Sequence, residues 1–139
     1  MSRVLALDHG AARCGCAISD PTGSVVTPLP AIERPETEPG LAAIADVVRE
    51  TGAARIVVGL PVTLAGDEGR QAATARSFAG RVARAAAVPV ELYDERLTTR
   101  QAARTGGASD EDSRAAAHLL EAWLAGARSG ATPTSPPAS

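Results

Sequence analysis

Three acidic residues stand where the elements of this chain are expected to end or begin. Asp8 closes the apolar run of residues 3–8, and Glu95 follows the apolar run of residues 88–93. Asp112 opens the last segment with helical periodicity. Ligand sites in an open α/β sheet lie outside the carboxyl ends of the strands. We therefore expect Asp8 and Glu95 to meet at one edge, provided that their strands are parallel neighbours.

Asp112 is placed by the periodicity of the residues that follow it. Steps of 3, 4, 7, 8 and 11 residues from Asp112 reach Ala115, Ala116, Leu119, Leu120 and Trp123. This spacing is typical of an apolar helix face, so we expect Asp112 to point toward the sheet. A carboxylate on such a face needs a partner, because burying an unpaired charge is costly. A metal ion would supply that partner.

Each acid also has a simpler explanation when it is taken alone. Asp112 could cap the last helix, in competition with Ser109 or Asp110. Asp8 could belong to a turn between two strands, and Glu95 could pair with a neighbouring arginine. The prediction of a shared site therefore depends on the three acids as a set.

Three converging carboxylates suit the hydrolysis of phosphodiester bonds. Mg²⁺ and Mn²⁺ prefer oxygen ligands, whereas His or Cys ligands would favour zinc. Two such ions, roughly 3.5–4 Å apart, activate the attacking water and stabilise the leaving oxygen. Asp8, Glu95 and Asp112 are therefore the candidate catalytic residues and the candidate ligands of Mg²⁺ or Mn²⁺.

Every basic side chain of this chain is an arginine, and the formal net charge is −2. No global positive field draws the protein to nucleic acid, so any such binding must depend on a local patch. The guanidinium group binds phosphate through two parallel hydrogen bonds. The candidate substrate-binding residues are Arg13, Arg96 and Arg100.

Apolar periodicity and turn residues predict the elements that position these side chains. Strands are predicted at residues 3–8, 14–19, 24–29, 55–60 and 88–93. Helices are predicted around residues 41–52, 68–86, 98–104 and 112–125, of which 98–104 is a short one. The order of the strands and long helices, βββαβαβα, indicates an α/β protein with a mixed five-stranded sheet flanked by helices.

The length of 139 residues fits one domain, which we place at residues 1–125. Residues 126–139 are rich in Pro, Ser, Gly and Thr, and we predict a disordered C-terminal tail there. Cys14 and Cys16 are too close for an unstrained disulfide and are expected to be small buried side chains. No signal segment precedes Val4 and no apolar run has the length of a membrane span, so we expect a cytoplasmic protein.

Four blocks of the sequence resemble the YqgF/RuvX family. The blocks are ALDHGAARCGCAISD, IVVGLPVTLAGDEGRQA, YDERLTTRQA and DSRAAAHLLEAWL, in the order and near the spacing of that family. The likeness spans roughly residues 3–125. It implies the ribonuclease H-like fold and a nuclease that acts in maturing the 5′ end of pre-16S ribosomal RNA. It also implies Asp8, Glu95 and Asp112 as the catalytic carboxylates.

Two details of the resemblance bear on the site. Asp94 is the rival of Glu95 for the middle ligand position. Because neighbouring side chains at a strand end diverge, only one of the two can face the other acids, and we favour Glu95. Residues 103–111 form a shorter segment than relatives usually carry, which affects the expected substrate-binding surface more than the carboxylates.

Other functions compete with cleavage of ribosomal RNA. The family is related to Holliday-junction resolvases, and symmetric cleavage of branched DNA would require a homodimer, whereas RNA trimming would suit a monomer. A non-catalytic RNA- or ribosome-binding module could keep the same fold. A phosphotransferase of the actin-like type would need a second domain, for which 139 residues leave no room.

Overall fold

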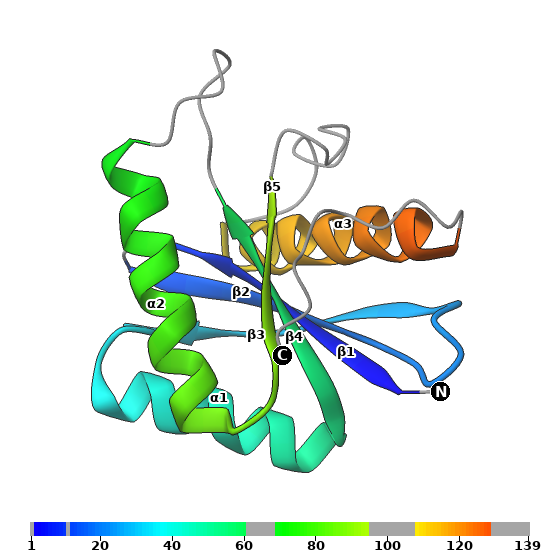
Figure 1. The fold of residues 1–139 in the computed structure, drawn as a ribbon, viewed down its shortest axis with the longest axis horizontal. Helices are drawn as coiled ribbons and strands as arrows, with labels where there is room; N and C mark the ends of the chain where they lie inside the picture. Colours follow the sequence, from blue (N-terminus) through cyan, green and yellow to red (C-terminus); the bar gives the residue numbers. More distant parts are fainter. Residues whose placement is uncertain (1, 11, 61–68, 95–107, 129–139) are drawn as a thin grey trace.

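The computed structural model describes residues 2–10, 12–60, 69–94 and 108–128, and the side chains in these ranges except those of residues 71, 108–112 and 128. The helices and strands are, in chain order, β1 (Arg3–His9), β2 (Arg13–Ser19), β3 (Val26–Glu33), α1 (Glu38–Thr51), β4 (Ala53–Leu60), α2 (Arg70–Ala86), β5 (Val90–Asp94) and α3 (Ala108–Arg128). This is the predicted order, βββαβαβα (Figure 1). The short helix predicted at residues 98–104 lies outside the described residues.

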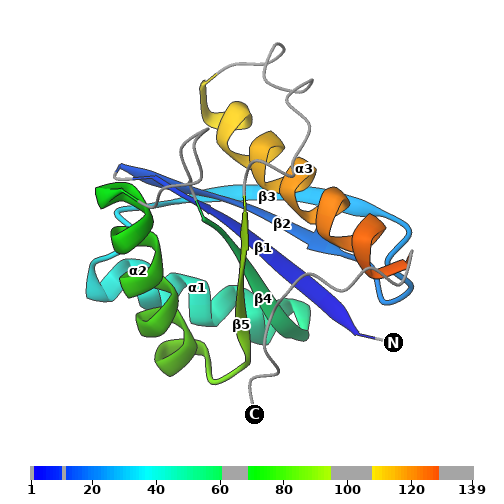
Figure 2. The same cartoon turned by 45° about the horizontal axis from the view of Figure 1, so that its top comes forward.

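The five strands form one mixed sheet in the order β3-β2-β1-β4-β5. Strands β1, β2 and β3 make an antiparallel meander, and β4 and β5 run parallel to β1. Helices α1 and α2 cover one face of the sheet and α3 covers the other (Figures 1 and 2). Because β1, β4 and β5 are parallel, their carboxyl ends lie at one edge.

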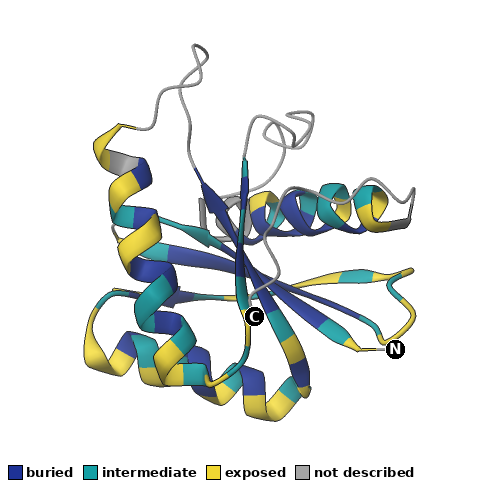
Figure 3. Cartoon of the chain, in the orientation of Figure 1, coloured by how far each residue is buried: buried dark blue, intermediate teal, exposed yellow. Residues whose placement is uncertain are grey.

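Alternation along the strands divides the core between the two faces. Leu5 and Leu7 pack with residues of α1 and α2, whereas Val4 and Ala6 pack with residues of α3. Figure 3 shows the buried strands between helices whose outer sides are exposed. Burying a large apolar side chain stabilises the fold by about 1.5–3 kcal/mol. The packing on both faces therefore holds the carboxyl ends of β1, β4 and β5 in place.

Helix α1 has strong signals at both ends. The Thr37 hydroxyl accepts a hydrogen bond from the Gly40 N–H at 3.2 Å and caps the first turn. The helix ends at Thr51 and is capped by Gly52, as predicted, with a left-handed φ of 74° that glycine adopts without strain.

Most element boundaries differ from the prediction by one to three residues, and the largest differences are in β3 and α3. The third strand spans Val26–Glu33 instead of residues 24–29, and it contains Pro28 and Pro30. Prolines indicate a break in a central strand, but β3 is an edge strand and tolerates them. Helix α3 begins at Ala108 and ends at Arg128, so three residues of the predicted tail are helical. Residues 129–139 lie outside the described part of the chain.

Cys14 and Cys16 are fully buried, unbridged side chains on one face of β2, as expected. In the described part of the chain, no helix combines the length and apolar character that crossing a bilayer requires.

Candidate active site

Asp8 lies on the α3 face of the sheet, near the carboxyl end of β1. Val4 and Ala6 pack into the core beneath α3, and strand alternation places Asp8 on the same face. The residue is half-buried. A carboxylate at this position is anchored by a buried strand yet reachable from solvent.

Glycines flank Asp8 on both neighbouring strands. Gly15 pairs directly with Asp8 across the β1–β2 ladder. On β4, Gly59 comes directly after Val58, the partner of Leu7, and so lies at the same edge. Since neither glycine has a side chain, both leave space beside the carboxylate on the face that Asp8 occupies.

A tight turn brings Arg13 toward Asp8. A Cβ atom at Gly10 would lie 2.7 Å from the backbone oxygen of Arg13, so this turn requires glycine. Arg13 precedes Gly15 by two residues and therefore shares the α3 face with it. Arg13 is therefore the diagonal neighbour of Asp8 across the β1–β2 pair, and the backbones of two such residues lie roughly 7–8 Å apart.

The condition set for a meeting of Asp8 and Glu95, that their strands are parallel neighbours, is met in direction but not in adjacency. Strand β4 lies between β1 and β5, so the two strands are roughly 9–10 Å apart. The crossover through α1 places β4 beside β1, a pairing that strand order in the sequence does not determine. Glu95, Arg96 and Arg100 lie outside the described residues.

Asp94 lies on the face opposite Asp8. It pairs with Leu60, which packs against Ala72 and Ala75 of α2. Residues that pair across neighbouring strands share a face, so Asp94 belongs to the α1/α2 side of the sheet. This position separates Asp94 from the Asp8 carboxylate.

Residue 112 lies within α3, and its side chain is outside the described set. The apolar stripe predicted from it was wrong at Ala115, which is exposed. Helix α3 rests on the sheet through a rotated face, made up of Ser113, Ala116, Ala117, Leu119, Leu120 and Leu124. Trp123 is half-buried at the border of that face, and its indole N–H donates a hydrogen bond to Glu91 at 3.0 Å.

Ser113 fixes the start of α3 against β3. It is 4% exposed, and its hydroxyl donates a hydrogen bond to the backbone oxygen of Leu29. This bond satisfies a carbonyl of the edge strand and holds the helix segment next to residue 112 over the sheet. Ser113 was not among the predicted site residues. Its position directly after Asp112, a candidate ligand, was the signal in the sequence that could have indicated it.

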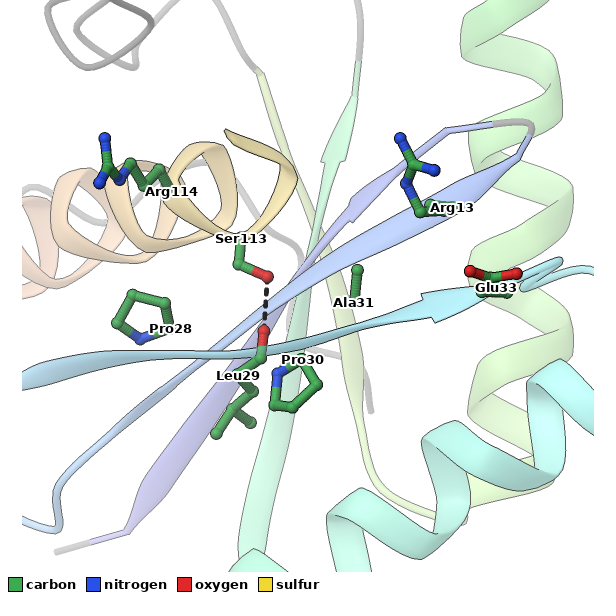
Figure 4. A pocket seen from close by; sticks show the side chains of 8 residues that line it. All are labelled: Arg13, Pro28, Leu29, Pro30, Ala31, Glu33, Ser113 and Arg114. Atoms are coloured by element: carbon green, nitrogen blue, oxygen red, sulfur yellow. Dashed lines mark hydrogen bonds between the residues drawn. The ribbon is translucent and has the colours of Figure 1, made fainter. Parts of the chain in front are cut away.

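A pocket of about 570 Å³ opens between α3 and β3. It is lined by Arg13, Pro28, Leu29, Pro30, Ala31, Glu33, Ser113 and Arg114. Figure 4 shows Arg13 and Arg114 on either side of Ser113, with the prolines along β3. The register between β2 and β3 shifts here, between Cys14 and Cys16, as at many functional sites. Arg114 was not predicted as a substrate-binding residue.

His9 anchors the end of β1 on the face opposite Asp8. Its Nε2 lies 2.7 Å from Oε2 of Glu36, and its ring centroid is 4.4 Å from that of Phe78. The imidazole therefore joins β1 to α2 and to the segment before α1.

Glu91 holds α3 and β4 to the edge strand β5. It accepts hydrogen bonds from Arg55 Nη1 at 3.2 Å and from the Trp123 indole. The Tyr93 hydroxyl donates to the backbone oxygen of Ala122 at 3.5 Å. Burial, and then the charges of Asp94 and Glu91, raise the pKa of Tyr93, which favours the protonated phenol that donates this bond.

The described residues contain no group of three Asp, Glu, His or Cys side chains able to hold a metal ion. Two of the three predicted ligands have side chains outside this set. His9 and both cysteines belong to the opposite face, so the described part of the Asp8 face offers oxygen donors at this edge.

Comparison with known proteins assigns the chain to a family. The model of the RuvX family, described as Holliday junction resolvases, matches residues 2–126. The chain belongs to the RuvX family. This RuvX-family protein is 43% identical, over 89% of its length and 97% of the relative's, to an Anaeromyxobacter sp. (strain Fw109-5) protein named as a proposed pre-16S rRNA nuclease. A Rhodococcus erythropolis relative with the same name is 40% identical over 88% of this chain and 77% of its own.

Solved structures show the same fold at low sequence identity. Thermus thermophilus RuvC in complex with a Holliday junction substrate matches 94% of this RuvX-family chain and 98% of its own, with a TM-score of 0.66 and 16% identity. A second structure of Thermus thermophilus RuvC matches 93% of this chain and 97% of its own, with a TM-score of 0.60 and 15% identity. The match confirms the predicted ribonuclease H-like fold.

Proposed function

We propose that this RuvX-family protein is a metal-dependent endonuclease that hydrolyses phosphodiester bonds, with the 5′ region of pre-16S ribosomal RNA as its substrate. The observation that carries the proposal is the position of Asp8. Its half-buried carboxylate stands at the edge where three parallel strands end, between two glycines. Ligands bind at such an edge in open α/β sheets.

Asp8, Glu95 and Asp112 are the proposed catalytic residues and metal ligands. Asp94 is a poor choice for the middle ligand, since it shares the α2 face with Leu60. That leaves Glu95 as the proposed partner of Asp8 across β4, where Gly59 puts no side chain in the way. Asp112 belongs to the helix that Ser113 fastens over the same face.

The oxygen donors on the Asp8 face suit Mg²⁺ or Mn²⁺. When bound, such an ion activates a water molecule and stabilises the charge of the leaving oxygen. The protein's own part is to orient the carboxylates and hold the substrate strand. Arg13, and in addition Arg114 across the pocket, would bind the phosphates next to the scissile bond. Arg96 and Arg100 are proposed for the same role.

The names of the relatives favour RNA over branched DNA. Relatives 40–43% identical are named for pre-16S rRNA, whereas RuvC in complex with a Holliday junction is only 16% identical. Branched DNA is the second candidate, because the family description names that substrate. We propose cytoplasmic action as a monomer for RNA, and as a homodimer for a junction.

The test compares cleavage of a pre-16S leader RNA with cleavage of a four-way DNA junction. Each reaction contains Mg²⁺, Mn²⁺ or a chelator. We expect metal-dependent cutting of the RNA, and a roughly thousand-fold slower rate for Asp8→Asn because several kcal/mol of transition-state stabilisation are lost. Asp46→Asn, at an exposed position of α1, is the matched control and should cut normally. Equal cutting by Asp8→Asn, or cutting in chelator, would overturn the proposal.

A further inference from the structure

Positive charge is concentrated in α2. From residue 69 to residue 90 the sequence contains four arginines and no Asp or Glu. The remaining residues carry ten arginines and sixteen acidic side chains, a formal charge of −6. Helix α1, on the same face of the sheet, carries three acidic residues and one arginine. The two helices therefore present opposite electrostatic surfaces.

Three of the four arginines form one strip. At 100° per residue, Arg70, Arg81 and Arg84 fall within about 60° of one another around the helix, and they span about 21 Å along its axis. Small residues lie on the same side between them, namely Ala73, Ser77 and Gly80. A Cβ atom at Gly80 would meet nothing within 4 Å, so this surface is open. We call Arg70, Arg81 and Arg84 the α2 strip.

The α2 strip is accessible, and its charges are not neutralised within the described structure. Arg70 and Arg84 are exposed and Arg81 is half-buried. Among the described residues, none of the three guanidinium groups forms an ion pair, whereas Arg49 pairs with Asp46 and Arg55 pairs with Glu91. Figure 3 shows exposed residues along the outer side of α2.

The strip leads away from the candidate site. Helix α2 connects the parallel strands β4 and β5, so it starts at the edge where β4 ends and runs to the opposite edge. Arg70 is therefore nearest to the edge that carries Asp8, and Arg84 is the most distant. A duplex strand carries one phosphate per about 3.4 Å, so 21 Å corresponds to about six phosphates.

We propose that the α2 strip binds the phosphate backbone of the nucleic-acid substrate beyond the cleavage point. This inference rests on the proposed function and adds a second contact region on the opposite side of α2 from the sheet. The strip carries no bulky apolar side chain, and its guanidinium groups, aligned along about 21 Å of the helix axis, match a line of phosphates. A symmetric contact between the strips of two copies is disfavoured, because it would set arginines against arginines.

The test measures binding without cleavage. Fluorescence anisotropy with a labelled pre-16S leader RNA, in chelator, gives the Kd at several salt concentrations. We expect the triple variant R70Q/R81Q/R84Q to bind more weakly. The slope of log K against log salt should fall by about 2 in magnitude, because three phosphate contacts at about 0.7 each are lost. Unchanged affinity and slope would overturn the inference.

A pair of single variants controls for net charge. Arg84 and Arg49 are both exposed arginines in the last turn of a helix, α2 and α1 respectively. Arg84→Gln should lower the slope by about 0.7, and Arg49→Gln should leave it unchanged. Equal effects of the two variants would mean that only overall charge matters. Ser77→Glu, which adds a carboxylate to the strip and removes no arginine, should also weaken binding.

Other outcomes separate this inference from the proposed function. RNA binding that depends on the strip, without metal-dependent cleavage, would support the inference and refute the nuclease. Mg²⁺-dependent cleavage together with RNA binding that does not depend on the strip would support the nuclease and refute the inference. Sedimentation velocity of wild type and triple variant identifies a self-association surface: a change in oligomeric state would overturn the inference.

Discussion

Asp8 and His9 are neighbours in sequence that serve opposite faces of the sheet. Asp8 follows Val4 and Ala6 on the α3 side, while His9 contacts Glu36 and Phe78 on the other side. A shift of one residue in the register of β1 would exchange the two faces. The His9 contacts and the requirement for Gly10 in the turn both oppose such a shift, so they hold the candidate catalytic carboxylate in position.

Asp20 shows how backbone donors hold a carboxylate in its charged form. The N–H of Val25, followed by the Thr22 hydroxyl, lowers the pKa of Asp20 from 3.8 to about 2. A folded-state pKa below the unfolded value means that the charged form stabilises the fold. We expect this stabilisation above pH 4, and its progressive loss as the pH falls from about 4 to about 2.

Thermal unfolding of wild type and Asp20→Asn across this pH range tests the prediction. The variant should melt at a lower temperature near neutral pH, and the gap should close toward pH 2. A constant gap at all pH values would mean that the charge of Asp20 contributes nothing. Asp46→Asn is the control, since its exposed carboxylate pairs only within one turn of α1.

At the scale of elements, the sequence predicted the order of strands and helices but not their lateral placement. Turn residues such as Gly52 mark element ends locally, and these predictions were confirmed. That β4 lies between β1 and β5 depends on how α1 and α2 pack, which no local pattern contains. The face of α3 was misjudged at Ala115 for a similar reason: residues 115–117 are three consecutive alanines, so the packing against the sheet decides which of them are buried.

The candidate site was predicted in part for the same reasons. The position of Asp8 near the end of β1 could be predicted because a buried strand ends there at a polar residue followed closely by glycine, which is a local signal. Ser113 and Arg114 were missed, since their role depends on the contact between α3 and β3, far apart in sequence. The roles of Asp8, Glu95 and Asp112 as catalytic residues and metal ligands stay predictions.

Ser113 joins two elements, and its loss should weaken both. In Ser113→Ala, the Leu29 carbonyl loses its buried donor, which should lower the free energy of unfolding by about 1–3 kcal/mol. Urea denaturation measures the difference. Ser77→Ala is the matched control, because it makes the same change at an exposed position of α2. Both variants replace serine by alanine within a helix, so both gain the same helix propensity. Equal stability of the two variants would contradict a structural role for the Ser113 bond.

At the scale of the whole molecule, the two faces of the sheet have different tasks. The α3 face carries Asp8, Arg13 and the pocket, and the opposite face carries the larger core with α1 and α2. The α2 strip lies on the outside of that second layer. If both proposals hold, the substrate contacts both layers and passes around the edge at which β1, β4 and β5 end.

The extent of the domain follows from α3, the only described element that covers the site face. Among its described side chains, the buried ones run from Ser113 to Leu124, and the helix ends at Arg128. A chain that ends at residue 128 should keep its free energy of unfolding within about 0.5 kcal/mol and keep its cleavage rate.

A chain that ends at residue 118 loses Leu119, Leu120 and Leu124 from the core, at about 2–5 kcal/mol each. That loss is comparable to the whole stability of a domain, so the shorter chain should not fold. Circular dichroism and urea titration of the two chains measure this, and a marked loss of stability in the longer one would show that residues 129–139 belong to the folded domain.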